Sequence, residues 1–132
     1  MATFQFNLVS PEKLLFSGEV TQVDVPGVEG EFGVLADHAP MVATVKPGIL
    51  VVYVDGDLRR VAVDGGFAEV SANGLTVLAD TAAPADQVDR ARLAATIKST
   101  EEDVADSKDD RKRDKLAHRL DQLRALQAAL GQ

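Results

Sequence analysis

The sequence predicts an amino-terminal antiparallel β-sandwich over residues 1–84, followed by a carboxy-terminal antiparallel two-helix hairpin over residues 85–132. At the amino terminus, Phe4, Phe6 and Leu8 alternate with polar residues, which is the period of a strand with one buried face. Turn dipeptides rich in glycine then recur at short intervals, as they do in sandwiches and barrels. The apolar period becomes helical in the last third of the chain, where no proline occurs.

Seven further runs complete the predicted sandwich. Each is short, rich in valine or other apolar residues, and bounded by turn residues. They are Val20–Val25, Gly33–Ala36, Val42–Val45, Ile49–Val54, Leu58–Val63, Phe67–Ser71 and Leu75–Ala79. Glycine and asparagine accept positive φ, so three dipeptides are predicted to be hairpin turns: Asp55-Gly56, Gly65-Gly66 and Asn73-Gly74.

Two helices are predicted after Pro84. The first runs from about Gln87 to about Asp106 with Asp86 as its N-cap, and its apolar stripe is thin and rich in alanine. The second runs from about Asp110 to about Leu130. Its leucines recur at steps of three and four, on one helical face: Leu116, Leu120, Leu123, Leu126 and Leu130. Docking on the sandwich is expected to be narrow, and the pattern leaves open whether the hairpin stays packed or detaches.

Composition restricts the class of protein. With five Phe, one Tyr and no Trp among 132 residues, the core must be mainly aliphatic. There is no cysteine, which excludes disulfides and thiolate chemistry and agrees with a reducing compartment. The amino terminus has no signal-peptide pattern, and no apolar run approaches the ~20 residues of a membrane span. We expect a soluble protein that docks onto other components.

The net charge of −7 is unevenly distributed. Residues 1–84 carry four basic and eleven acidic groups, whereas residues 107–132 carry seven basic and four acidic groups. The basic tail is interleaved with aspartates and the rest of the chain would repel phosphates, so an acidic protein is a better partner than nucleic acid.

No catalytic constellation emerges from the sequence. The two histidines, His38 and His118, fall in different halves of the chain, too few for a typical zinc or iron site. No phosphate-binding P-loop or nucleophile elbow occurs, and the adjacent Asp37 and His38 rarely reach each other in triad geometry. We therefore expect no catalytic residues, no metal site and no enzyme activity by the chain alone.

One segment carries a resemblance to a known family. Gly30-Glu-Phe-Gly-Val-Leu-Ala-Asp-His-Ala-Pro40 is a loop shaped by two glycines and a proline. Together with Val23-Asp-Val-Pro-Gly27, Met41 and Lys46-Pro-Gly48, it resembles the signature of the epsilon subunit of the F-type ATP synthase. The order of sandwich, proline-containing junction and two helices agrees with that family over the whole chain.

The resemblance implies a non-catalytic rotor subunit in the central stalk, coupling proton translocation to ATP synthesis. It implies binding to the gamma subunit and to the proteolipid ring, and contact of the carboxy-terminal helices with the catalytic head of alpha and beta subunits. It also implies a peripheral location on the cytoplasmic face of the bacterial inner membrane, attached through the complex. No cofactor is expected apart from a regulatory ATP.

Two residues of the signature segment match family contact positions. The resemblance assigns Glu31 to the proteolipid ring, where a carboxylate on a glycine-flanked loop accepts hydrogen bonds; the alternative is a solvated turn glutamate. It assigns His38 to the gamma subunit. The alternative for His38, which does not exclude the first, is a histidine that ties down its own loop by hydrogen bonding.

A second family feature is ATP binding at a short pattern that begins the helices. The matching stretch is Val88-Asp89-Arg90-Ala91-Arg92-Leu93, in which Asp89 and Arg92 are three residues apart and are expected on one helical face. The resemblance makes them candidate ATP ligands. Val88 and Leu93 depart from the family pattern, and these departures favour the alternative, a surface ion pair.

The third feature is the basic face of the last helix. In the family, such residues meet an acidic stretch of the catalytic subunits and restrain ATP hydrolysis; the alternative is a solvated helix face. The matching residues are Arg111, Lys112, Arg113, Lys115, Arg119 and Arg124. A different class of protein also fits the pattern, namely a free-standing ligand-binding β-sandwich with a helical oligomerisation hairpin.

Overall fold

The computed structural model describes residues 2–131. Strands come first and two helices come last, as predicted. The strands are β1 (Phe4–Val9), β2 (Leu14–Val20), β3 (Gln22–Gly27), β4 (Gly30–Val34), β5 (Met41–Val54), β6 (Asp57–Ser71), β7 (Gly74–Ala79) and β8 (Ala82–Pro84). They are followed by the 3₁₀ helix η1 (Ala85–Gln87) and the helices α1 (Arg90–Asp106) and α2 (Asp110–Leu130).

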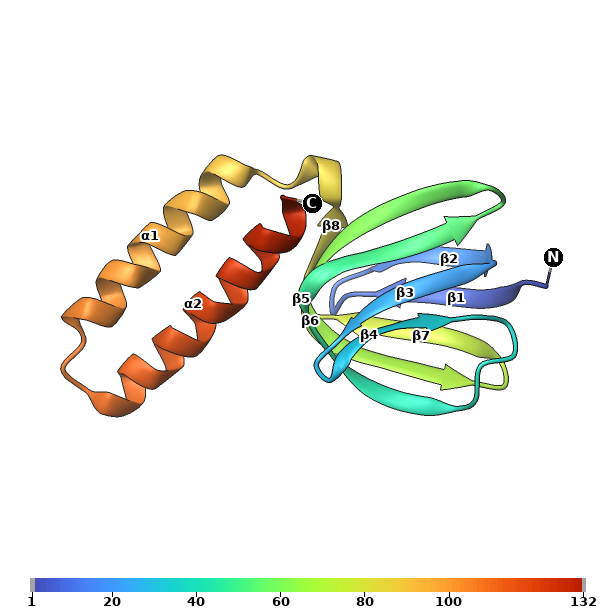
Figure 1. Cartoon of the computed structure of the whole chain (residues 1–132), viewed down its shortest axis with the longest axis horizontal. Coiled ribbons are helices and arrows are strands. Elements are labelled where there is room, and N and C mark those ends of the chain that lie inside the picture. Colours follow the sequence, from blue (N-terminus) through green and yellow to red (C-terminus); the bar gives the residue numbers. More distant parts are fainter. Residues whose placement is uncertain (1, 132) are drawn as a thin grey trace.

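The eight strands form one continuous sheet in the order β2-β1-β7-β6-β5-β3-β4, with β8 paired to β6 off this path. Every pairing is antiparallel except that of β1 with β7. The sheet curves over on itself so that two layers of strands face each other, and the helices extend from one side (Figure 1). The β-sandwich prediction is therefore confirmed.

The prediction of a hairpin turn at Gly65-Gly66 is wrong. Both glycines lie within one long strand, β6, which pairs with an equally continuous β5 from Met41↔Val70 to Val54↔Asp57. The predicted pairs of short strands are thus single strands that run through both layers. Gly65 and Gly66 have positive φ values of 87° and 139°, and these bend β6 instead of reversing it. A Cβ on Gly66 would lie 2.0 Å from the Leu78 carbonyl oxygen, so the neighbouring strand requires glycine there.

Two strands, β2 and β8, were not predicted from the sequence. In β2, three consecutive apolar residues are followed by Ser17 and Gly18, so the alternation of a half-buried strand is missing. The strand β8 has only three residues and ends in a proline, and it forms because it pairs with Val61–Val63 of β6. The strand predicted over residues 33–36 is shifted, because β4 already begins at Gly30, opposite Gly27.

The sandwich core is aliphatic, as predicted. Sixteen buried residues form one cluster between the layers, and all of them come from β1 to β7. The largest side chains with almost no exposure are Phe6, Leu8, Leu50 and Leu75, and seven valines join them. Such a core resists change in volume by even one methylene group, because interiors are close-packed.

The first helix begins later than predicted. Asp86 belongs to η1, and Val88 has extended backbone with ψ of 127°, which separates η1 from α1. The N-cap is Asp89, whose Oδ1 accepts a hydrogen bond from the Arg92 backbone N–H at 2.9 Å. The expectation that Asp89 lies within the helix is therefore wrong. The second helix has the predicted bounds, and Asp109 caps it by accepting from the Arg111 and Lys112 N–H groups.

The leucine face of α2 is divided between two partners. Leu120 and Leu123 pack with Ile97 of α1, whereas Leu126 and Leu130 pack against the sandwich. Only Ile49 and Ala62 of the cluster around Leu130 belong to the sandwich, and the chain between the sandwich and α1 adds Ala85 and Val88, with Leu93 from α1 itself. This agrees with the narrow docking expected from the sequence. Over residues 2–131, neither helix has the length and apolarity that a membrane crossing requires.

Candidate partner-binding surfaces

Glu31 lies at an exposed position on β4, next to the tip of the β3–β4 hairpin. It stands opposite Pro26 of β3, which has no N–H to offer to a partner strand. Within residues 2–131, no hydrogen bond or ion pair to the Glu31 carboxylate is formed. The structure thus leaves this carboxylate free to accept donors from outside the chain.

His38 is half-buried in the loop between β4 and β5. Its Nδ1 lies 2.7 Å from the Ala39 carbonyl oxygen, and because a carbonyl only accepts, Nδ1 carries the proton. The His38 backbone N–H also donates to the Leu35 carbonyl at 3.0 Å, and the imidazole lies 6.4 Å from the Phe32 ring. His38 therefore ties down its own loop, and its Nε2 makes no hydrogen bond within the described chain.

A polar cluster beside Glu31 was not found from the sequence. The Tyr53 hydroxyl donates to Asp24 Oδ2 at 2.8 Å, and Gln22 Nε2 donates to Asp24 Oδ1 at 2.7 Å. The hydrogen bond from Tyr53 to Asp24 raises the pKa of Tyr53. Partial burial and the charges of Asp24 and Glu31 raise this pKa further. A Cβ on Gly33 would lie 3.1 Å from Asp24 Oδ1, so glycine makes room for the carboxylate. The only available signal was the alternation of Gln22 and Asp24 along β3.

An apolar patch lies on the outer face of the sheet over β5, β6 and β7. Val42, Phe67 and Leu78 are 67%, 56% and 53% exposed. Phe67 on β6 stands directly opposite Leu78 on β7. Val42 on β5 stands opposite Glu69, which is two residues from Phe67 along β6 and therefore lies on the same face. We call these three residues the outer apolar patch. A patch of large exposed side chains on a regular sheet is typical of a surface that another protein covers.

Asp89 and Arg92 are in contact at the amino-terminal end of α1. The contact joins the Asp89 carboxylate to the backbone N–H of Arg92 and does not involve the Arg92 side chain. The Asp89 carboxylate is occupied as the N-cap of the helix, and the Arg92 guanidinium forms no ion pair within residues 2–131. The predicted surface ion pair between the two side chains is therefore absent from the described chain. A ligand for Arg92 would not need to displace a carboxylate.

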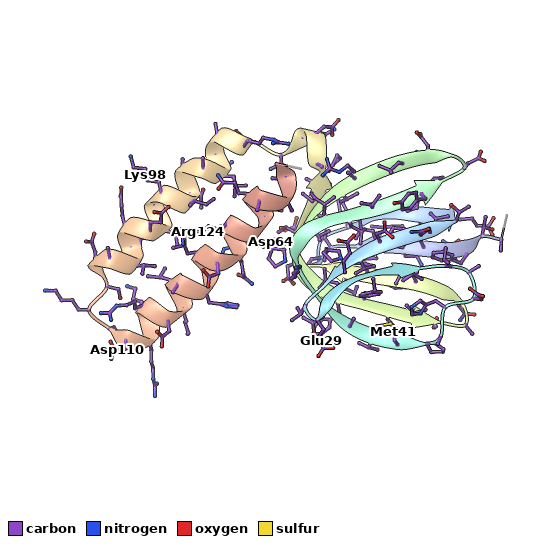
Figure 2. All side chains as sticks on the ribbon, in the orientation of Figure 1. Glu29, Met41, Asp64, Lys98, Asp110 and Arg124 are labelled. Carbon is purple, nitrogen blue, oxygen red and sulfur yellow. The ribbon has the colours of Figure 1, made fainter. Side chains whose placement is uncertain are left out.

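The six basic residues of α2 divide into two groups. Arg113 donates to the Ser107 carbonyl at 2.8 Å, Arg119 forms an ion pair with Asp64 of β6 at 3.0 Å, and Arg124 pairs with Glu101 of α1 at 3.6 Å. Figure 2 shows Asp64 on the side of the sandwich that faces α2. The other three form no ion pair within residues 2–131 and are exposed: Arg111, Lys112 and Lys115.

The candidate residues are spread over separate surfaces instead of converging on one pocket. Among the residues that the structure describes, no three His, Asp or Glu side chains are grouped so as to hold a metal ion. A free carboxylate beside a hairpin, an uncovered sheet face and an exposed cationic helix can contact other macromolecules. Fold and surfaces together define a class of protein, a β-sandwich subunit with a helical hairpin that acts by binding other chains.

Comparison with known proteins identifies the family. The family described as ATP synthase, Delta/Epsilon chain, beta-sandwich domain matches residues 3–85, and the chain belongs to this family. The ATP synthase epsilon chain 1 of Nitrobacter hamburgensis is 55% identical over 130 residues, which cover 98% of this chain and 96% of the relative. The ATP synthase epsilon chain of Afipia carboxidovorans is 54% identical over 127 residues, covering 96% and 93%. The resemblance of the signature segment is confirmed.

One solved structure agrees with the fold over 98% of this chain, and a second over 65% of it. A chain in the cryo-EM structure of the Euglena gracilis mitochondrial ATP synthase, OSCP/F1/c-ring in rotational state 1, superposes with a TM-score of 0.84 at 28% identity. The match covers 98% of this chain and 82% of that chain. A chain of the Tetrahymena thermophila central stalk and c-ring superposes with a TM-score of 0.57 at 13% identity, which supports the fold alone.

Proposed function

We propose that the chain is the epsilon subunit in the central stalk of an F-type ATP synthase, where it couples proton translocation to ATP synthesis without catalysing either. The observation that carries this function is the identity of about half of all residues with epsilon chains over nearly the full length of both proteins. The matching chain in the Euglena assembly, which contains F1 and a c-ring, supports the same role. The bacterial relatives support a peripheral position on the cytoplasmic face of the inner membrane.

Co-purification from native membranes tests this proposal. A tagged chain expressed in its own cells should be recovered from solubilised membranes together with the gamma subunit, the proteolipid ring and the alpha and beta subunits. Recovery only as a small soluble oligomer would reject the proposal in favour of a free-standing sandwich.

For Glu31 we propose contact with the polar loops of the proteolipid ring. The support is that its carboxylate is exposed and free of partners within the described chain. Glu31→Lys should weaken proton-driven ATP synthesis in membrane vesicles while leaving the isolated chain folded, because β4 pairs through its backbone. Glu12→Lys makes the same charge change in an exposed turn and is the control. Unchanged synthesis in the Glu31 variant would reject the contact.

For the gamma subunit we propose a surface made of His38 and the outer apolar patch. The patch offers large uncovered side chains, and the loop hydrogen bonds hold His38 in one orientation with Nε2 available. Phe67→Glu should prevent co-purification with gamma, since a carboxylate would be desolvated in the interface. Leu14 on β2 is comparably exposed at 58%, so Leu14→Glu is the matched control. Equal recovery of gamma with both variants would contradict this surface.

For the helical hairpin we propose regulation of ATP hydrolysis through contact of α2 with the catalytic head. Arg111, Lys112 and Lys115 support it because they are exposed cations without ion-pair partners in the described chain. Their attraction to an acidic surface would weaken with salt. Removal of residues 85–132 should raise ATP hydrolysis by the assembled complex. An unchanged hydrolysis rate would remove the inhibitory role.

A regulatory ATP site at Asp89 and Arg92 remains a separate proposal. Support comes from the Arg92 guanidinium, which has no ion-pair partner among residues 2–131 and can bind phosphate with two hydrogen bonds. The capping role of Asp89 weighs against its use as a ligand. Equilibrium dialysis with ATP decides: binding that Arg92→Gln removes would support the site, and no binding at millimolar ATP would reject it.

A further inference from the structure

An apolar cleft opens on the side of the sandwich where the chain leaves for the helices. Its volume is about 520 Å³, within the range of small-molecule sites. Residues of β2, β6 and β8 line it, among them Leu15, Phe16 and Ala83. The nearly buried Leu8 and the half-buried Val61 also line it. We call this hollow the β2–β8 cleft.

The cleft exists because one strand position in the sheet is empty. The strand β8 pairs with Val61–Val63 of β6 and ends at Pro84, after which η1 turns the chain away. In the part of the chain that the structure describes, Leu58, Arg59 and Arg60 therefore have a strand partner on the β5 side alone. Leu58, next to this gap, is 51% exposed, a large apolar side chain that the chain itself does not cover.

Two arginines stand at this apolar hollow. Residues 2–84 contain four basic residues, and two of them, Arg59 and Arg60, line the cleft. The Arg59 guanidinium lies over the Phe16 ring, 5.7 Å from its centroid, so an apolar surface holds it at the cleft. Neither arginine forms an ion pair within residues 2–131. Asp86 is the single carboxylate among the lining residues.

The chemistry of this lining selects one kind of ligand. An alkyl chain fits the walls because they are mostly aliphatic, and a carboxylate fits the rim because guanidinium groups bind it with paired hydrogen bonds. Elsewhere the sandwich is strongly acidic and repels anions. We propose that the β2–β8 cleft binds a medium-chain fatty carboxylate, with its alkyl chain between β2 and β8 and its carboxylate on Arg59, whose guanidinium lies over Phe16.

Calorimetric titration of the full chain with octanoate, decanoate and dodecanoate, each below its micelle concentration, tests the site. Affinity should rise about fourfold for each buried methylene. Arg59→Gln should weaken dodecanoate binding by about tenfold, since a charged hydrogen-bond donor is lost. Lys46→Gln removes one charge from β5 outside the cleft and should bind like the parent chain. Circular dichroism verifies that each variant is folded.

A second variant and two further ligands complete the test. Ala83→Trp should abolish binding by filling the cleft, and dodecyltrimethylammonium, which has a cationic head, should not bind. Equal binding of this cation and dodecanoate, or equal affinity of Arg59→Gln and Lys46→Gln, would overturn the proposal. Tighter binding of an extended acidic peptide, acetyl-Glu-Val-Glu-Val-Glu-amide, would show that a strand occupies the gap and would overturn it as well. None of these outcomes bears on the role in the central stalk, because the titration uses the isolated chain.

Discussion

Single residues decide where the backbone departs from regular strands. Gly66 has φ of 139°, and its Cα faces the Leu78 carbonyl of the paired strand. This glycine permits β6 to bend between the two layers, which is why a dipeptide with the composition of a hairpin turn lies within a strand. From the sequence, a bend and a turn are the same pattern; the difference lies in the strand β5 that continues opposite it.

Gly66→Ala is expected to destabilise the chain by about 2 kcal/mol or more, because the new Cβ would clash with the β7 backbone at a strained φ. Gly18→Ala is the matched control. Its Cβ would lie 3.7 Å from the Phe16 ring, an ordinary contact, and should cost less than about 1 kcal/mol. Urea unfolding of both variants measures the difference. Equal midpoints for the two variants would contradict the close approach at Gly66.

Tyr53 is the single tyrosine of the chain, so its ionisation is visible by absorbance. Its pKa is raised above the ordinary 10.0 chiefly by the hydrogen bond to Asp24. The pKa should fall in Asp24→Asn and stay unchanged in Glu69→Gln, which alters a carboxylate on another strand. Because the folded-state pKa is raised, its stabilising contribution is present below pH 10 and is lost as pH rises through the folded value. An alkaline absorbance titration that gives one pKa for all three proteins would refute this assignment.

At the scale of elements, α2 is held to α1 and to the sandwich to a similar extent. Two leucines of α2 pack within the hairpin, two pack on the sheet, and Arg119 with Asp64 provides the ion pair across the junction. Leucine spacing on one face predicted the helix and its bounds. It did not predict the division of that face, because helical period reports burial without naming the surface that buries each residue.

Arg119→Gln should lower the free energy that holds α2 on the sandwich by about 0.5–1 kcal/mol, because it removes the ion pair with Asp64. In this pair the Arg119 side chain is about half exposed and the Asp64 side chain is mostly buried. Arg124→Gln is the control in the same helix, because Arg124 pairs with Glu101 inside the hairpin. Amide hydrogen exchange is the measurement. Faster exchange over the end of α2 and the facing part of β6 is expected for Arg119→Gln alone. The same exchange pattern in both variants would show that the ion pair of Arg119 with Asp64 does not hold α2 on the sandwich.

At the scale of the whole molecule, the core and the hairpin are nearly independent in their packing. The main cluster of buried residues contains no residue beyond Ala79. The hairpin buries its apolar face partly within itself and partly against the sandwich, and helices of this length are weakly populated in water without tertiary contacts. Stability should therefore reside mostly in the sandwich.

A fragment that ends after Pro84 is expected to fold cooperatively, because it retains the complete core and β8. Its Tm should fall by a few degrees as Ile49 and Ala62 lose their cover, whereas a fragment of residues 85–132 should be mostly unstructured. Circular dichroism on heating measures both. A sandwich fragment without a cooperative transition would show that the helices are required for its folding.

The sequence by itself determined the fold class, the bounds of the second helix and the family, because alternation, leucine spacing and the segment from Gly30 to Pro40 are all local patterns. Only the tertiary structure decided that β5 and β6 are continuous, that Asp89 caps α1, and that Asp24 binds Tyr53. It also placed Arg59 and Arg60 at an apolar cleft. These features depend on residues that meet across strands, and no periodicity along one chain records which distant residue stands opposite.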